Sequence, residues 1–423
     1  MKYADYRPFV PNKEQSRILG KTAEKHTAAR MDTERAQKIF TEWNALYNTP
    51  FKGVTVDGHR QKGLFRLKNA DAPTQAMCEA AWGLLNNITP EQRRRSHHPV
   101  GSPLWRKWQN SEMYVEDYGL RLESASADTR SRVLNVLAAS LSEQGYATSL
   151  GVMQLNAFLG QVLDAPGVLN EWSYSFVLFG VPSLTEPWGW QMYGHHLVLN
   201  CMVIGGQMTL TPCFLGAEIV YADQGPFEGL AMFKDHERIG LEFMNSLPGK
   251  SQEQAIVGKS MLGEDLPPGR RHLADYFNLG GAYQDNRIVP YEGLPLGSLE
   301  SDQRNLLLDL VNEYIAPLPD GPRQARMEEF ERHEQDTHFC WIGGTGSNDP
   351  FYYRIQSPVV FIEFDHHPGM FLTNEMPLKY HIHTIVRTPN GNDYGIDLLR
   401  QHYKSAHKHD HSHSHDHDHD HDH

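Results

Sequence analysis

The chain has few cysteines and no long apolar run, and both absences exclude classes of protein. Its four cysteines, among 423 residues, are far apart and form no CxxC pair, so neither a zinc ribbon nor a disulfide framework is expected. No stretch of about 18 apolar residues is present that would span a membrane. The N-terminal sequence MKYADYRPFV has no apolar segment typical of a secretory signal. We therefore expect a cytoplasmic protein with no membrane partner.

Positively charged residues are in the minority, and the common catalytic sequence motifs are absent. The 39 Lys and Arg residues are outnumbered by 52 Asp and Glu, for a formal net charge of −13, which argues against nucleic acid as a partner. The chain has no GxSxG elbow, HExxH helix, P-loop or Rossmann fingerprint. We therefore expect the partner to be a small-molecule substrate, bound by residues outside these four motifs.

Hydrophobic periodicity predicts helices early in the chain and mainly strands later. The predicted helices cover residues 12–30, 33–47, 73–87, 127–143, 148–163, 229–247, 302–316, 322–335 and 396–407. The predicted strands cover 172–183, two strands around the Gly205-Gly206 turn within 188–214, 351–358, 359–365 and 381–387. Because helices and strands come in blocks without regular alternation, we predict an α+β fold. Its helical N-terminal third is followed by a mainly antiparallel sheet flanked by helices.

The domain organisation follows from the same pattern. We predict a single large domain over 1–406, mainly helical over 1–100, with the catalytic or binding region over 101–406. The tail over 407–423 alternates His with Asp and Ser and cannot build a core, so we predict that it is disordered. Its imidazoles and carboxylates are metal ligands. The tail is therefore either a collector of transition metal or a neutral extension resembling a purification tag.

The segment HIH is the first candidate metal site. On a strand His381 and His383 share one face, while Ile382 points to the other. Two imidazoles at that spacing can hold one metal ion. The alternative is a hydrogen-bonded pair of histidines on a solvated strand.

The segment GHHL supplies further candidate ligands. Within a strand His195 and His196 face opposite ways, so only one of them is expected to join a given site. The face that carries His196 is the more polar one, which makes His196 the preferred ligand and His195 a supporting group or a proton carrier. Gly194 suggests a bulge, and a bulge would break this alternation.

Carboxylates complete the candidate site. Glu363 and Asp365 share a strand face, and burying both is costly unless a cation lies between them. We take Asp365 as a candidate metal ligand, and Glu237 or Glu363 as the candidate general base. The alternative for each of them is an ordinary surface carboxylate.

Two arginines and a tyrosine flank these groups. Arg354 and Arg387 lie on the predicted strands and are candidates for orienting an acidic substrate, because guanidinium groups bind carboxylates in a bidentate manner. Tyr353, beside Arg354, is a further candidate catalytic residue. The alternative is that the arginines simply pair with Glu363 or Asp365.

A series of segments between about residue 100 and residue 407 forms a further pattern: PWGWQMYGHHLVLN, TPCFLGAEI, GLAMFKDHE, FCWIGGTG, YYRIQSPVVFIEFD, HIHTIVRTPNGNDYGIDLL and the final HY. In their order and spacing these segments resemble the family called domain of unknown function 3500, found in fungi and bacteria. The resemblance implies that the histidines of GHHL and HIH match family motif positions, together with Glu237, Tyr352, Tyr353, Arg354, Glu363, Asp365, Arg387 and Asp393. It implies no reaction, because the family is named for its unknown function.

The residues favour a metal-dependent enzyme that acts on a small polar substrate. Histidines with one carboxylate would hold Zn²⁺ or Fe²⁺ and leave a coordination position open. Zinc would support hydrolysis, which we favour because it requires fewer parts, and iron would support an oxidoreductase or oxygenase. Two further possibilities are a metal storage or delivery protein that uses the tail, and a binding module without metal.

Overall fold

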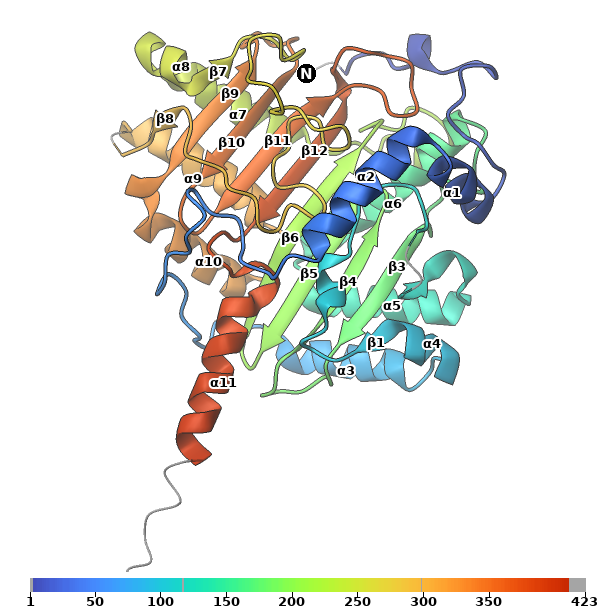
Figure 1. The fold of residues 1–423 in the computed structure, drawn as a ribbon, viewed down its shortest axis with the longest axis vertical. Helices are drawn as coiled ribbons and strands as arrows, with labels where there is room; N and C mark the ends of the chain where they lie inside the picture. Colours follow the sequence, from blue (N-terminus) through green and yellow to red (C-terminus); the bar gives the residue numbers. More distant parts are fainter. Residues whose placement is uncertain (1–2, 116–117, 298, 411–423) are drawn as a thin grey trace, which may run out of the picture.

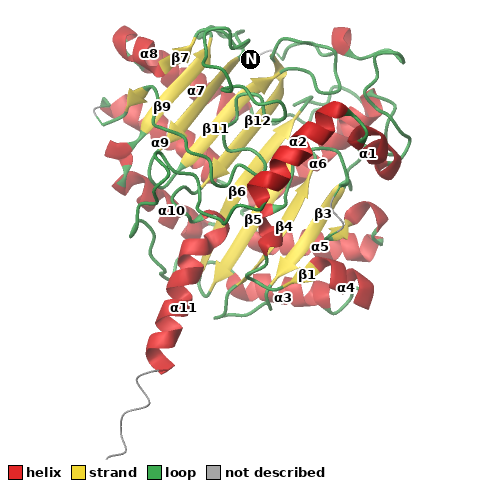
Figure 2. Cartoon of the chain, in the orientation of Figure 1, coloured by secondary structure: helices red, strands yellow, loops and turns green. Residues whose placement is uncertain are grey.

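In the computed structural model, the structure describes residues 3–115, 118–297 and 299–410. Its centre is one 12-stranded, mostly antiparallel sheet, drawn as a continuous layer in Figure 2. The order is β1-β3-β4-β5-β6-β12-β11-β10-β9-β7, with β2 on β3 and β8 on β9. The strands are β1 (His97–His98), β2 (Leu120–Arg121), β3 (Tyr174–Phe179), β4 (Trp188–Gly194), β5 (Leu197–Ile204), β6 (Gln207–Ala217), β7 (Ile256–Gly258), β8 (Leu294–Pro295), β9 (His338–Gly343), β10 (Phe351–Gln356), β11 (Phe361–His367) and β12 (Leu378–Arg387).

Eight of the twelve strands form two four-stranded antiparallel meanders joined side by side, and the short strands β1, β2, β7 and β8 pair with the outer strands β3 and β9. β3 to β6 follow one another in the first meander, and β9 to β12 follow one another in the second. They meet through antiparallel pairing of β6 with β12, in which His383 lies opposite Gly216. The predicted α+β class with a mainly antiparallel sheet is confirmed.

Helices lie on both sides of this sheet (Figure 1). They are α1 (Ala23–Met31), α2 (Glu34–Tyr47), α3 (Thr74–Leu85), α4 (Pro90–Ser96), α5 (Ala127–Ser140), α6 (Glu143–Val162), α7 (Lys234–Ser246), α8 (Gly249–Ala255), α9 (Ser301–Ile315), α10 (Asp320–Arg332) and α11 (Ile396–Asp410). A Thr or Ser side chain accepts a backbone N–H in the first turn of α1, α2, α4, α5 and α6, which accounts for where these helices begin.

Several predicted element boundaries are wrong. The helix predicted over 12–30 begins only at Ala23, where Thr22 caps it. Strand β9 was not among the predicted strands. The segment 188–214 forms three strands rather than two, because His195 and His196 make the turn between β4 and β5.

The C-terminal boundary also differs from the prediction. The predicted disordered tail begins at residue 407, but α11 continues to Asp410. Residues 411–423 lie outside the described residues.

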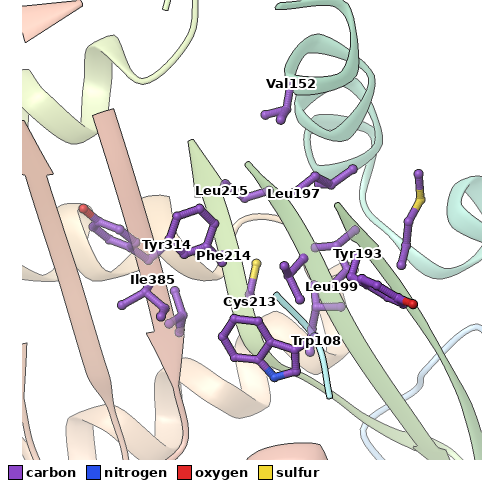
Figure 3. Close-up of a cluster of buried hydrophobic side chains, with 14 of the residues drawn as sticks. Trp108, Val152, Tyr193, Leu197, Leu199, Cys213, Phe214, Leu215, Tyr314 and Ile385 are labelled. Atoms are coloured by element: carbon purple, nitrogen blue, oxygen red, sulfur yellow. The ribbon is translucent and has the colours of Figure 1, made fainter. Parts of the chain in front are cut away.

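One face of the sheet, the helix face, is apolar and aromatic. Tyr353 stacks on Phe364 and lies against Gly240 of α7, and its hydroxyl group meets that of Tyr314 on α9 at 2.6 Å. Figure 3 shows part of the core, in which Leu197 of β5 and Leu215 of β6 lie toward Val152 of α6. Burial of this apolar surface is the main term that stabilises the sheet.

The opposite face, the histidine face, is polar. Residues at alternate positions of β10, β11 and β12 point there, as the pairing of Asp365 with His383 and of Arg354 with Glu363 requires. Helix α2 and the irregular segment 259–293 lie in front of the strands on this side in Figure 1. The segment is tied down by Gln356, which donates to the carbonyl oxygen of Val289.

Within the described residues, no helix is both long enough and apolar enough to cross a membrane.

Candidate metal centre

Three buried imidazoles converge on one point of the histidine face. Nε2 of His383 lies 3.0 Å from Nε2 of His196 and 3.0 Å from Nε2 of His381, and the third side of this triangle is 3.3 Å. All three side chains are at most 4% exposed. We call this group the three-imidazole centre.

The two halves of the sheet supply these ligands by different means. His381 and His383 come from β12, and their shared face follows from strand alternation, as predicted from HIH. His196 comes from the β4–β5 turn, where its backbone adopts the left-handed conformation with φ of 62°. This turn is held by Tyr174, whose hydroxyl group donates to the carbonyl oxygen of His195.

Gly216 makes room for the pair of histidines that meet across β6. A Cβ at this position would lie 2.6 Å from the carbonyl oxygen of Ile382, and 3.0 and 3.1 Å from ring carbons of His383 and His196. The backbone N–H of Gly216 donates to the carbonyl oxygen of His196, which fixes the turn against the strand.

The geometry fits a bound transition metal. Zinc–nitrogen bonds of about 2.0–2.1 Å at tetrahedral angles place ligand nitrogens about 3.4 Å apart, close to the distances seen here. Nδ1 of His381 donates to the carbonyl oxygen of Pro368 at 2.9 Å, so its Nε2 carries a lone pair directed into the centre. Burial and the neighbouring imidazoles hold the pKa of all three histidines well below the usual value. They are therefore neutral, as metal ligands must be.

A second group of possible ligands adjoins the first. One ligand atom from each of Asp365, His367 and His383 lies within 4.8 Å of the others. Oδ1 of Asp365 is 3.9 Å from Nδ1 of His383 and accepts a hydrogen bond from Asn278. Burial raises the pKa of Asp365, so a nearby cation would favour its ionised form. These buried His and Asp clusters have the composition to hold a metal ion.

A cavity of about 80 Å³ leads to His196 and His383. One water needs about 10–15 Å³ by this measure, so the cavity has room for several waters or a small polar group. Its wall includes the exposed Arg35 at the start of α2, which places the cavity mouth at the protein surface. Trp43 of the same helix gives the wall an apolar part.

His195 also lines this cavity without joining the three-imidazole centre. Its Nδ1 lies 2.7 Å from Oδ1 of Asn156, an acceptor, so Nδ1 carries the proton and Nε2 keeps a lone pair. Burial lowers the pKa of His195 to about 4. Only His196 lies at the three-imidazole centre, which is consistent with the prediction that one histidine of GHHL joins the site. The two histidines are separated by the β4–β5 turn and not by strand alternation.

Glu112 is a further charged residue of the cavity wall. Although burial opposes its ionisation, a 3.0 Å contact with Nε2 of His26 and the nearby Arg30 lower its pKa to about 2. The carboxylate is thus ionised at neutral pH, with both basic partners beside it.

Two predicted catalytic residues lie on the helix face, away from the three-imidazole centre. Glu237 of α7 contacts Lys379 at 2.8 Å and Nε2 of His366 at 3.4 Å. The hydroxyl group of Tyr353 donates to the carbonyl oxygen of His236. Their catalytic roles stay predictions, and no contact with the centre supports them.

Three other predicted residues share the histidine face but are engaged in structural contacts. Glu363 accepts the backbone N–H groups of Leu279 and Gly280 and the hydroxyl group of Tyr352. Arg354 binds Glu292 at 2.7 Å.

Arg387 is the third of these residues and is fully buried. It donates to Asp285, to Asp393 and to two backbone carbonyl oxygens. The alternative stated above named Glu363 or Asp365 as the partners of these arginines. Both arginines pair with carboxylates, but with Glu292, Asp285 and Asp393 instead.

The sequence reasoning missed some residues of the site. His367 follows Asp365 by two positions in FDHHP, so extending the period-two rule past Asp365 would have placed it on the histidine face. Asn156, Glu112 and Gly216 carried no comparable local signal, because each reaches the site only through long-range packing.

The comparisons with known proteins give one family. The chain matches the family described as "Protein of unknown function (DUF3500)" over residues 70–396. This match begins earlier than the resemblance noted in the sequence. No curated protein and no solved structure matches the chain.

Proposed function

Because the chain belongs to the DUF3500 family, which is described only as proteins of unknown function, we propose a function from the metal centre itself. The protein is a metal-dependent enzyme that hydrolyses a small polar substrate. The observation that carries this proposal is the convergence of three Nε2 atoms at 3.0–3.3 Å beside a cavity that reaches the surface.

The donor set favours zinc. Three neutral histidines with a fourth position open to a cavity are one of the ligand arrangements of catalytic zinc sites. When bound there, zinc supplies a hydroxide near neutral pH and polarises the group under attack. His196 and His383 both line the cavity, so an ion held by these histidines would be accessible to a substrate in it.

The chain's own residues handle the proton and the substrate. His195 accepts a proton at Nε2, since Asn156 holds its other nitrogen in the protonated form. Arg30 and Arg35 at the cavity wall orient a polar or acidic substrate, a role that the sequence suggested for Arg354 and Arg387. Trp43 contacts its apolar part.

A specific observation favours oxidative chemistry as the second candidate. Asp365, His367 and His383 form a set of two histidines and one carboxylate, which is the ligand set of non-haem Fe²⁺ oxygenases. Oxygen consumption by the Fe²⁺-loaded protein, without hydrolysis of small esters and amides by the Zn²⁺-loaded protein, would favour this candidate over hydrolysis.

The decisive measurement is the metal content of a full-length variant in which every histidine from His407 to His423 is replaced by Ser. An enzyme should retain at least one tightly bound ion per chain, whereas a storage protein that relies on the tail should lose most of its capacity. In that background His381→Ala and His196→Asn should lower the bound metal, because each removes one ligand; Asn tolerates the left-handed backbone at position 196.

His59→Ala is the matched control, since His59 is highly exposed and belongs to neither group of possible ligands. It should leave the metal content unchanged. If folded protein that has been incubated with metal ions holds no stoichiometric ion, the proposal is contradicted.

A further inference from the structure

A group of buried polar atoms without partners lies at the Nδ1 edge of His383, away from the three-imidazole centre. Among the described residues, no hydrogen-bond partner reaches Oδ2 of Asp365, Nε2 of His367 or Nδ1 of His383. These side chains are at most 4% exposed. Buried polar atoms are nearly always paired in folded proteins, so three unpaired atoms in one place call for an explanation.

The protonation of His367 is fixed by its other nitrogen. Its Nδ1 lies 2.8 Å from the carbonyl oxygen of Pro368, which only accepts, so Nδ1 carries the proton and Nε2 carries a lone pair. The same carbonyl oxygen accepts from His381. Because both histidines donate to this one carbonyl oxygen through Nδ1, each keeps a lone pair on Nε2. The lone pair of His381 belongs to the three-imidazole centre, and that of His367 belongs to the second ligand group.

Further acceptors surround the same place. Asn278 donates through Nδ2 to Asp365, and its own Oδ1 has no described partner. The buried Asp275 is close enough for its charge to act on both Asp365 and His367. His272 lies 3.2 Å from Asp275 and partly offsets its charge, and the Asn278 amide does the same for Asp365. A cation beside Asp365 and the unpaired atoms would offset the remaining lost hydration.

We propose that Asp365, His367 and His383 bind a second metal ion, and that His383 bridges the two ions through its two ring nitrogens. Nε2 of His383 ligates the ion of the three-imidazole centre, and Nδ1 ligates the second ion while its proton passes to solvent. The mixed nitrogen and oxygen donors suit a first-row transition metal such as Zn²⁺ or Cu²⁺. This inference rests on the proposed function for the first ion.

A simpler role for Asp365 fits the distances less well. Carboxylates commonly orient a metal-bound histidine by accepting its second N–H. Here Oδ1 of Asp365 is 3.9 Å from Nδ1 of His383, beyond hydrogen-bond range. That role would also leave Oδ2 of Asp365 and Nε2 of His367 unpaired.

The test counts ions in the full-length variant whose tail histidines are replaced by Ser. Loaded with Zn²⁺ and freed of excess metal, it should hold two ions per chain. His367→Gln and Asp365→Asn should each hold one, because the three Nε2 ligands remain. His383→Ala should hold none tightly.

His366→Gln is the matched control, since it makes the same change at the neighbouring residue on the opposite face of the strand. It should keep both ions. A count of one in the parent would overturn the second site and leave the proposed function standing, whereas a count of zero would overturn both.

A spectroscopic readout separates bridging from two independent sites. With Cu²⁺ at both positions, spins coupled through the His383 ring should suppress the electron paramagnetic resonance signal of isolated ions. In His367→Gln the isolated-ion signal should return. Two ions without any coupling would refute the bridge, and circular dichroism on each variant checks that it folds.

Discussion

Gly216 shows how one missing side chain can determine a metal centre. It lies on β6 opposite His383, at the seam of the two meanders. Its backbone is the surface against which the rings of His196 and His383 pack. Any Cβ there would press on a backbone carbonyl, which cannot move away as the end of a flexible side chain would.

Gly216→Ala should therefore weaken metal binding by at least about tenfold, because a displacement of one ligand ring by a few tenths of an ångström spoils the ligand geometry. The measurement is competition with a chromogenic chelator. Gly83→Ala is the control: it lies in α3 with nothing within 4 Å of the added methyl group, and Ala is the better helix former. Unchanged affinity in Gly216→Ala would show that Gly216 does not position the ligand rings.

At the scale of elements, buried ion pairs hold the irregular segment 259–293 over the histidine face. Asp285 of this segment is 1% exposed and contacts Arg387 of β12 at 2.9 Å and Arg106 at 2.8 Å. It also accepts from the hydroxyl group of Tyr394. One carboxylate thus connects three parts of the chain that are distant in sequence.

Asp285→Asn should lower the free energy of unfolding by about 3 kcal/mol, because removing one partner of a buried ion pair leaves uncompensated charge. Chemical denaturation measures this loss. Asp128→Asn, at a largely exposed i,i+4 pair with Arg132, should cost less than about 1 kcal/mol. Equal losses in the two variants would contradict the importance of this network.

At the scale of the whole molecule, the metal centre joins the two halves of the sheet. His196 belongs to the first meander, and His381 and His383 belong to the second. An ion bound to all three is therefore a bridge that exists only in the folded state. Binding to the folded state alone adds to its stability by mass action.

Removing metal with a chelator should lower the thermal midpoint of unfolding. At a free-ion concentration about 1,000 times Kd, linkage adds about 4 kcal/mol to the free energy of unfolding. Scanning calorimetry of the tail-substituted chain, with and without chelator, measures the shift. His383→Ala should show no shift, and an equal shift in that variant would place the stabilising ion elsewhere.

The sequence by itself determined those features that depend on local periodicity. Strand alternation is a property of each strand alone, so the shared face of His381 and His383, and of Glu363 and Asp365, followed from their spacing. The α+β class followed from the block order of helices and strands. The chemistry of histidine then indicated a metal.

Only the tertiary structure decided which distant residues meet. The pairing of β6 with β12 brings His196 to HIH, and a left-handed turn, invisible to alternation, selects His196 over His195. Long-range packing likewise placed Glu237 on the helix face, away from the centre. Spacing within one segment cannot encode such choices, because they depend on which face each strand presents and on what covers it.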